Sequence, residues 1–528
     1  MAFIGKNVIE NLTTAMYENL LIVYREYIQN SADSIDKAIK QGLINSNNAE
    51  IYIDISPEDR SIIIEDTGVG IAASDFIKIM SSIADSTKDP AENKGFRGIG
   101  RLGGISVCQE LRFSCSAFGE EIESVVSWNA KKVKEILVDH TQNPEAAALV
   151  DSVTSYSTKE CEKDKHFFKV EMIGVEKSAS ELLDVNLIKQ YLRSVAPLPY
   201  EVGFIFRSKI HEFAEANNFI LDEYNVFVNG DRLYKEYKTK LYEEKNGQKV
   251  KYDELLDVQF EIFYSDDNSV LSWMWYGISR FEKAIPAVNT MRGIRLRKGN
   301  IQIGNELTFY NHGFYKESRG YSYFVGEVFA VHSELRPNAR RDYFNINDYC
   351  REFEYKLREL FFNRFYTIYH HANQVKKAYQ KRQELSKTQH EYDEKLTEGF
   401  DSPEDKESLE TQIDKLQEEV ARADKTIETR TTKEETDEVL SRVYGAIQDT
   451  YDIPKSDDSV ILPTEDGEPQ IEEKNPYKKK VKYKSQNLSQ YSKKEQKLIG
   501  KIYGIIRAIL PHDMADVVIN KIQEELSK

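Results

Sequence analysis

Five glycines fall within the ten residues 95–104, and this loop restricts the fold of the 528-residue chain more than any other segment. They are Gly95, Gly98, Gly100, Gly103 and Gly104, and an apolar stretch follows them. Successive backbone N–H groups in such a loop, leading into a helix N-terminus, form a cradle for phosphate groups. The spacing also matches the G-x-G-x-x-G dinucleotide fingerprint, which requires a buried strand directly before it, whereas the preceding residues are polar. A Rossmann site is therefore disfavoured, and the lack of G-x-x-x-x-G-K-[ST] excludes a P-loop NTPase.

A polar helix face lies upstream of this loop. Glu26, Asn30 and Asp33 are spaced four and three residues apart, so they share one face of a helix over about 24–39. An amide oxygen is a neutral ligand suited to Mg²⁺, and a carboxylate one turn earlier can accept a proton from a water that attacks a phosphate. The same pattern is also typical of an ordinary amphipathic surface helix.

A third segment ends an apolar run with an acid and two glycines. Residues 62–64 are all isoleucine, and Asp66, Thr67, Gly68 and Gly70 follow them. A strand that ends this way places a carboxylate at the sheet edge, beside backbone that a planar ligand can approach. Asp66 can accept a hydrogen bond from the exocyclic amine of adenine, although Asp-Thr-Gly is also a common turn.

The order and separations of these three segments resemble the GHKL ATPase superfamily, most closely the 90-kilodalton heat-shock chaperones. The Glu-x-x-x-Asn-x-x-Asp helix stands at 26–33 and the Asp-Thr-Gly-x-Gly box at 66–70. The resemblance implies an α/β sandwich that binds ATP and Mg²⁺. It assigns Glu26 as the general base, Asn30 as the Mg²⁺ ligand and Asp66 as the adenine acceptor. Asp33, Gly68 and Gly70 complete the nucleotide site by the same resemblance.

The glycine loop resembles the third box of this family, at the ATP lid. SSIADSTK at 81–88 is similar to the stretch that opens the lid, and GFRGIG at 95–100 is similar to the phosphate-binding box. The resemblance adds these cofactor-binding residues: Lys88, Gly95, Phe96, Arg97, Gly98, Ile99 and Gly100. One departure concerns the Gly-Thr pair that the family usually has before a late strand, because KDKHFFKVEMIGV lacks it. We therefore expect the contact with adenine to differ from the contact that is usual in the family.

The sequence becomes richer in aromatic residues and in strand patterns after the nucleotide-binding segments. We expect an α+β protein, with an ATP-binding domain at 1–190 and an aromatic, strand-rich middle or transducer domain at 195–350. SELRPNARRDYF at 333–344 resembles the middle-segment loop whose arginine reaches the γ-phosphate, which gives Arg341 a catalytic role with Asn338 and Arg340 beside it. The alternative is an arginine pair that bonds Asp342 or Glu334.

Beyond 350 the composition shifts to Glu, Lys, Gln and Arg. Apolar residues four and three apart from Leu409 to Ile427 predict a coiled-coil arm over 351–430, folded as an antiparallel helical hairpin. Gly399, Ser402 and Pro403 have the positions of a C-cap, an N-cap and a first helical residue. A charged linker or tail is expected at 431–484, and a small helical module, for docking or dimerisation, at 485–528.

The charge and the apolar content of the chain limit where the protein can reside and which partners it can bind. The formal net charge is −16, which argues against bulk phosphate binding, although a lysine-rich run at 474–484 could touch DNA. The four cysteines show no C-x-x-C pair and no window is long and apolar enough for a membrane span, so we expect a cytoplasmic protein with no membrane partner.

Together these features predict Mg²⁺-dependent ATP hydrolysis that drives a dimeric conformational clamp with chaperone-like action on a protein client. We expect a homodimer, and an operon partner is possible. The alternative is a clamp that acts on DNA, like MORC or MutL proteins, in a role such as bacterial antiviral defence. A histidine kinase is less favoured because only 23 residues precede the Glu26 helix, and His370 and His371 follow the second domain. An inactive nucleotide-binding scaffold is disfavoured because the candidate base and metal ligand are both present.

Overall fold

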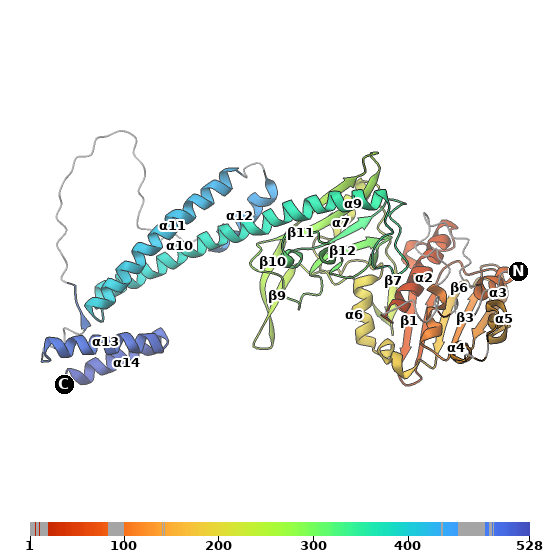
Figure 1. The fold of residues 1–528 in the computed structure, drawn as a ribbon, viewed down its shortest axis with the longest axis horizontal. Helices are drawn as coiled ribbons and strands as arrows, with labels where there is room; N and C mark the ends of the chain where they lie inside the picture. The colour runs from red at the N-terminus through yellow and green to blue at the C-terminus, as the bar shows by residue number, and fades with distance from the viewer. Residues whose placement is uncertain are drawn as a thin grey trace. The chain divides into compact units, whose positions relative to one another are not determined.

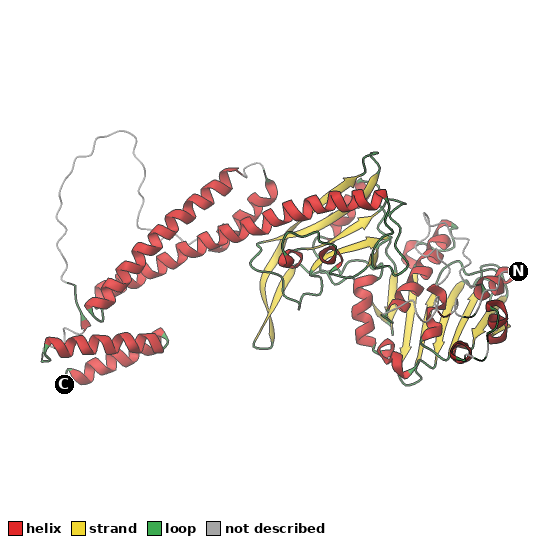
Figure 2. Ribbon diagram, viewed as in Figure 1, coloured by secondary structure: helices red, strands yellow, loops and turns green. Residues whose placement is uncertain are grey.

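The computed structural model describes residues 19–82, 100–139, 143–433, 437–451, 481–484 and 490–528, together with residues 6, 10, 141 and 488. These residues divide into two compact units, 1–367 and 368–528, which are described separately (Figure 1). Helices and strands mix in the first unit, and the second is helical (Figure 2). The α+β fold class is confirmed.

The first sheet has eight strands in the order β5-β4-β3-β6-β2-β1-β7-β8. Its strands are β1 (Glu50–Ser56), β2 (Ser61–Asp66), β3 (Glu110–Ser116), β4 (Ile122–Trp128), β5 (Thr154–Glu160), β6 (Phe167–Ile173), β7 (Asn225–Val228) and β8 (Asp231–Arg232). All neighbours are antiparallel except β1 and β7. Residues 225–232 fall in the range that we expected to form the second domain, but in the structure β7 and β8 pair with the strands of the first sheet.

Helices cover one face of this sheet and form a two-layer α/β sandwich (Figure 1). They are α2 (Ile22–Lys40), α3 (Ala73–Ser81), α4 (Ala130–Val138) and α5 (Ala146–Val153), with the 3-10 turns η1 (Ser46–Asn48), η2 (Gly100–Ser106) and η3 (Lys177–Leu183). Strand alternation explains the layers: Ile51, Ile53 and Ile55 are buried in the core, whereas Tyr52 between them stacks on Phe227 on the other face.

The second sheet has six strands in the order β13-β12-β14-β11-β10-β9. These are β9 (Lys240–Lys245), β10 (Gln248–Tyr264), β11 (Val270–Ser279), β12 (Gly293–Lys298), β13 (Ile301–Ile303) and β14 (Val325–Ala330). The surrounding helices are α7 (Arg207–Ala216), α8 (Thr308–Asn311), η4 (Ser318–Tyr323), α9 (Asp348–Glu359) and the π-helical turn η5 (Leu360–Phe365). α6 (Val185–Val195) instead buries Ile188, Leu192 and Val195 in the core of the first sheet. Trp273 and Trp275 of β11 are fully buried and anchor an aromatic core.

A buried ionic cluster crosses the second sheet. Glu327 of β14 pairs with Arg297 of β12 and with Lys235, whose Nζ lies 3.0 Å from a Glu327 oxygen. The Tyr200 hydroxyl donates to the same carboxylate, and Trp275 Nε1 donates to the Tyr200 oxygen at 2.9 Å. Every charge in this cluster therefore has a partner, which burial requires.

The second unit begins within α10 (Tyr366–Glu398), which α11 (Pro403–Lys433) follows. Arg382 of α10 pairs with Asp424 of α11 at 2.7 Å, and Tyr392 donates to Glu410 at 2.8 Å. Residue numbers rise along one helix as they fall along the other, so the pair is antiparallel, as expected. The N-cap prediction is also confirmed, because the Asp405 N–H donates to Ser402 Oγ at 3.2 Å.

Three further helices complete the second unit: α12 (Glu438–Tyr451), α13 (Lys493–Ile509) and α14 (His512–Leu526). α12 lies inside the range expected to be a charged linker, and its apolar side chains Leu440, Val443 and Ile447 are buried. The tip of the hairpin binds α13, because Arg507 pairs with Asp401. Within the described part of the chain, no helix is long and apolar enough to cross a bilayer.

Candidate nucleotide site

The polar face of α2 lies against the described part of the glycine-rich loop, which begins at Gly100. A Cβ atom at Gly100 would stand 2.4 Å from Glu26 Oε2, closer than side chains approach, so the bare backbone of this residue touches the carboxylate. Glu26 is only 6 % exposed, Asp33 is buried and Asn30 is half-buried. Two segments that were predicted to share a site are therefore in contact.

Tyr27, which sequence reasoning did not single out, holds η2 against α2. Its hydroxyl donates to the Arg101 carbonyl at 3.0 Å and accepts from the Gly104 N–H at 3.1 Å. A Cβ at Gly104 would stand 2.7 Å from the same hydroxyl. This pair of hydrogen bonds fixes the distance between the helix and the end of the loop. This role could not be predicted from the sequence, because a tyrosine next to a candidate base does not indicate which backbone groups its hydroxyl will bind.

The Asp-Thr-Gly-x-Gly turn is packed tightly against its neighbours. Asp66 is buried at the end of β2 and accepts from the Gly68 N–H at 2.9 Å. A Cβ at Gly68 would lie 2.0 Å from Ser34 Oγ of α2, and one at Gly70 would lie 2.0 Å from the Ser116 carbonyl, where φ is also +70°. Both glycines are therefore required by close approach, and the turn fixes the Asp66 carboxylate between α2 and β3.

The neighbour of Asp66 on the next strand is aromatic. In the strand register Asp66 pairs with Phe168 of β6, and Phe168 pairs with Cys115 of β3. Thr67 serves the fold, because its hydroxyl donates to the Asn48 carbonyl at 2.8 Å. His166 Nδ1 lies 2.7 Å from the Gly68 carbonyl and ties the strand to the turn. The surroundings of Asp66 thus differ from the family pattern, in line with the missing Gly-Thr pair.

Arg341 reaches this site from the loop after the second sheet. Its Nε lies 2.8 Å from Glu26 Oε1, and both side chains are more than nine-tenths buried. Its backbone has φ of +55°, a left-handed conformation that costs a non-glycine residue about 1 kcal/mol. The Arg341 N–H donates to the Asn338 carbonyl, and its own carbonyl accepts from Gly304 at 2.8 Å. The loop therefore holds the guanidinium at the carboxylate.

The other charges of the loop have partners elsewhere. Glu334 pairs with Arg336 at 2.7 Å, and Asp342 accepts from the Asn338 amide. Arg25 of α2 donates to the Arg340 carbonyl at 3.5 Å, so the helix and the loop are joined by a second contact that sequence reasoning missed. The arginine pairing expected as the alternative, with Asp342 or Glu334, gives way to the pairing of Arg341 with Glu26.

A cleft of about 720 Å³ opens beside this ion pair. α2 and α6 form one side, and the residues 302–306 and 340–342 form the other. Tyr191 of α6 lines it, and burial raises the pKa of this phenol to about 12, so it stays protonated near neutral pH. Arg341 lines this cleft, whereas Glu26, Asn30 and Asp66 do not.

Several predicted site residues lie outside the described residues: Lys88, Gly95, Phe96, Arg97, Gly98 and Ile99. Among the residues that the structure describes, no group of three or more His, Cys, Asp or Glu side chains could hold a metal ion. The residues present nevertheless fit Mg²⁺, because this ion in nucleotide sites takes one or two protein oxygens and the substrate phosphates. Asn30 provides such an oxygen on the Glu26 face of α2.

The fold and this arrangement define a nucleotide-binding sandwich of the GHKL type. Residues 17–166 match a family model described as histidine kinase-, DNA gyrase B-, and HSP90-like ATPase. The chain therefore contains an ATPase domain of this superfamily. The rest of the chain lies outside that match.

Relatives with curated names are chaperones called HtpG. The protein of Halalkalibacterium halodurans is 27 % identical over 133 residues, which cover 22 % of this chain and 21 % of the relative. That of Buchnera aphidicola subsp. Cinara cedri is 26 % identical over 218 residues, 37 % of this chain and 32 % of the relative. The protein of Buchnera aphidicola subsp. Acyrthosiphon pisum is 32 % identical over 143 residues, which cover 24 % of this chain and 23 % of the relative. The chain thus spans a third or less of the length of these relatives.

Proposed function

We propose that this protein hydrolyses ATP with Mg²⁺ and uses the cycle to drive a dimeric clamp that acts on a protein client. The observation that carries the proposal is the ion pair between Glu26 and Arg341. It joins the candidate base of the ATPase domain to an arginine of the following domain. A change at the nucleotide site is thereby coupled to the second domain.

Glu26 acts as the general base in this proposal. Its carboxylate touches Gly100 of the phosphate-binding loop, so an attacking water bound beside this contact is within reach of the carboxylate. Bound Mg²⁺ would lower the charge of the phosphates and orient them, with Asn30 as its protein ligand. Asp66 accepts from the adenine amine, and Asp33 keeps the polar face of α2 directed at the nucleotide.

Arg341 exchanges anionic partners during the cycle. A guanidinium binds a carboxylate or a phosphate with similar geometry, and the γ-phosphate carries the greater charge. When Arg341 turns to the γ-phosphate, it releases the Glu26 carboxylate for its water and stabilises the charge that develops in phosphoryl transfer. ATP binding thereby moves the loop that carries Arg341, and with it the second domain.

An exposed apolar stripe on α13 supports the homodimer. Leu498, Ile502, Ile505 and Ile509 are four, three and four residues apart, and each is 42–73 % exposed. Such a straight stripe is self-complementary, as the interface of a two-fold dimer must be. We expect Ile505→Glu to convert a dimer to a monomer in analytical ultracentrifugation, whereas Lys493→Glu at the start of the helix leaves the dimer intact. A monomeric wild-type chain would contradict this part of the proposal.

DNA is the less favoured partner. Residues 482–484 of the basic run pair with the tip of the α10–α11 hairpin, because the Phe400 N–H donates to the Lys482 carbonyl and the Lys484 N–H donates to the Phe400 carbonyl. This part of the run therefore has a structural role, and residues 474–480 lie outside the described residues. A phosphoacceptor role for His371 is also less favoured, because this residue lies on α10, after the second sheet.

The proposal is tested by Glu26→Ala. Loss of a general base is expected to lower ATP turnover at least about a hundredfold, while calorimetry shows that nucleotide binding is retained. Glu65→Ala is the matched control, because Glu65 is a partly exposed carboxylate of β2 that pairs with Lys169 away from the site. An undiminished turnover in Glu26→Ala would refute the assignment of the base.

A further inference from the structure

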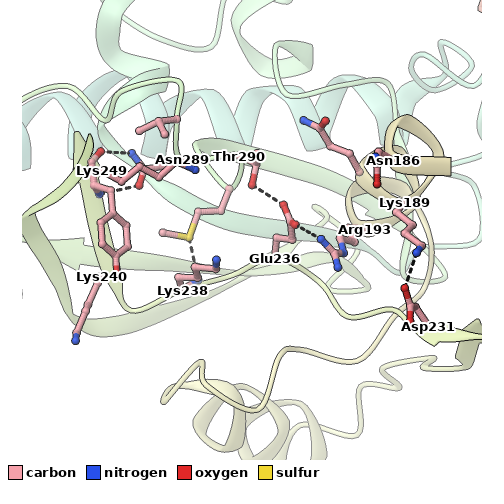
Figure 3. A pocket seen from close by; sticks show the side chains of 14 residues that line it. Asn186, Lys189, Arg193, Asp231, Glu236, Lys238, Lys240, Lys249, Asn289 and Thr290 are labelled. Atoms are coloured by element: carbon pink, nitrogen blue, oxygen red, sulfur yellow. Dashed lines mark hydrogen bonds and ion pairs between the residues drawn. The ribbon is translucent and has the colours of Figure 1, made fainter. Parts of the chain in front are cut away.

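A second hollow lies between the first and the second sheet, where α6, β8, β9, the start of β10 and residues 288–291 meet (Figure 3). Its volume is about 660 Å³, which is in the range of sites for small molecules. Five basic residues line it: Lys189, Arg193, Lys238, Lys240 and Lys249. The acidic residues of the lining are Asp231 and Glu236. The lining thus carries a charge of +3 in a chain whose net charge is −16.

Both acidic groups pair with the basic residues of α6. Lys189 Nζ lies 2.5 Å from Asp231 Oδ2, and Arg193 Nη1 lies 2.6 Å from Glu236 Oε1. Figure 3 shows these pairs side by side on the α6 wall. They hold the two cations in place, and the remaining positive charge belongs to the other three lysines. Within the described residues, none of those three makes a salt bridge.

The opposite wall is held by hydrogen bonds to the backbone. The buried amide of Asn289 accepts from the Tyr242 N–H at 2.9 Å and donates to the Tyr242 carbonyl at 2.8 Å, as a neighbouring strand would (Figure 3). Met291 Sδ accepts from the Lys238 N–H at 3.1 Å, which fixes the backbone below that lysine. The cleft is therefore preformed, and a ligand need not order it on binding.

We propose that this cleft binds a compact ligand through two or three adjacent phosphate groups. These three lysines make no salt bridge among the described residues and leave the lining with a surplus of positive charge, which adjacent phosphates match better than a single carboxylate does. Thr290 and Asn186 add neutral polar groups at the rim. The volume suits a ligand of nucleotide size, and the nucleotide site of the ATPase domain uses none of these residues.

The test uses the full-length chain and tripolyphosphate as the probe, titrated by calorimetry in saturating ADP without added Mg²⁺. Lys238→Glu/Lys249→Glu is expected to weaken binding at least about twentyfold, since each charge reversal costs roughly fivefold or more. Glu236→Gln is expected to strengthen binding, because it removes a negative charge and frees Arg193. Lys245→Glu is the matched control on the same hairpin. Lys245 lies outside the cleft lining, and its partner Glu243 keeps Lys283.

The outcome does not depend on the proposed ATPase cycle, because wild type and variants are compared with one probe. Equal affinities in wild type and in the double lysine variant would overturn the proposal, as would weaker binding in Glu236→Gln. The proposal of a compact phosphate ligand would also be overturned, in favour of nucleic acid, by a single-stranded oligonucleotide that binds more tightly than tripolyphosphate and whose binding is lost in the same double variant. Thermal unfolding of each variant shows whether a loss of binding reflects a loss of fold.

Discussion

Two buried carboxylates of this protein, Glu26 and Glu327, each pair with an arginine, but their surroundings differ. Glu327 has no exposed surface and binds Arg297, Lys235 and the Tyr200 hydroxyl inside one domain. Glu26 retains some exposure and pairs with Arg341, which lies on the loop after the second sheet and has left-handed backbone. A saturated cluster fixes one packing arrangement, whereas a pair beside a cleft can exchange its partner.

Burial of a charge pair therefore does not by itself indicate function. The carboxylate of Glu327 has three tightly bound partners, so removal of its charge leaves buried cations without compensation. The Glu26 pair lies beside a cleft of about 720 Å³ and against the backbone of Gly100. Perturbing the first carboxylate should therefore change stability, and perturbing the second should change turnover.

The largest effect is expected for Glu327→Gln. Burial by itself raises the pKa of Glu327, but Arg297 and Lys235 outweigh burial and lower it to about 2. The carboxylate therefore stabilises the folded state fully above its ordinary pKa near 4.5, and this contribution is lost as the pH falls from there toward 2. We expect the variant to lose about 3–5 kcal/mol at pH 7 and the difference from wild type to shrink below pH 4.5.

Chemical denaturation at several pH values measures this difference. A difference that stayed constant from pH 7 to pH 3 would show that Glu327 does not titrate with the expected low pKa. Glu171→Gln is a suitable control, because that carboxylate lies in the first sheet, is partly exposed and is 3.7 Å from Arg112. Its removal should cost less than about 1 kcal/mol.

A smaller effect, on turnover, is expected for Gly100→Ala. The added Cβ would stand 2.4 Å from Glu26 Oε2, so the carboxylate has to move. We expect ATP turnover to fall about tenfold, because a small displacement of a catalytic group is costly, while the fold is retained. Gly203→Ala is the matched control, since a Cβ there meets no atom within 4 Å. Equal turnover in the two variants would separate Gly100 from the catalytic site.

Much of the geometry of the candidate nucleotide site could be predicted from the sequence because its described residues lie in short segments with fixed spacing. Helical periodicity places Glu26, Asn30 and Asp33 on one face, and a strand followed by glycines places Asp66 at a sheet edge. Contacts made by single side chains across the fold, such as those of Tyr27 and Arg25, have no such pattern.

The assignment of strands to sheets was harder to predict. β7 pairs in parallel with β1, more than 160 residues earlier, and alternation along a strand does not reveal its neighbour. Charged residues in strands, such as Arg297 and Glu327, have the sequence pattern of exposed positions, so a fully buried ionic cluster could not be expected. The apolar positions of α12 likewise gave too weak a signal among charged neighbours.

The exchange of Arg341 between Glu26 and the nucleotide is the central claim, and ATP turnover of Arg341→Ala at saturating ATP and Mg²⁺ tests it most directly. We predict that turnover falls at least about a hundredfold while ATP binding, measured by calorimetry, is retained, because the guanidinium acts on charge that develops during transfer. Arg336→Ala, in the same loop but paired with Glu334, should hydrolyse ATP like wild type. Unchanged turnover in Arg341→Ala would contradict the account.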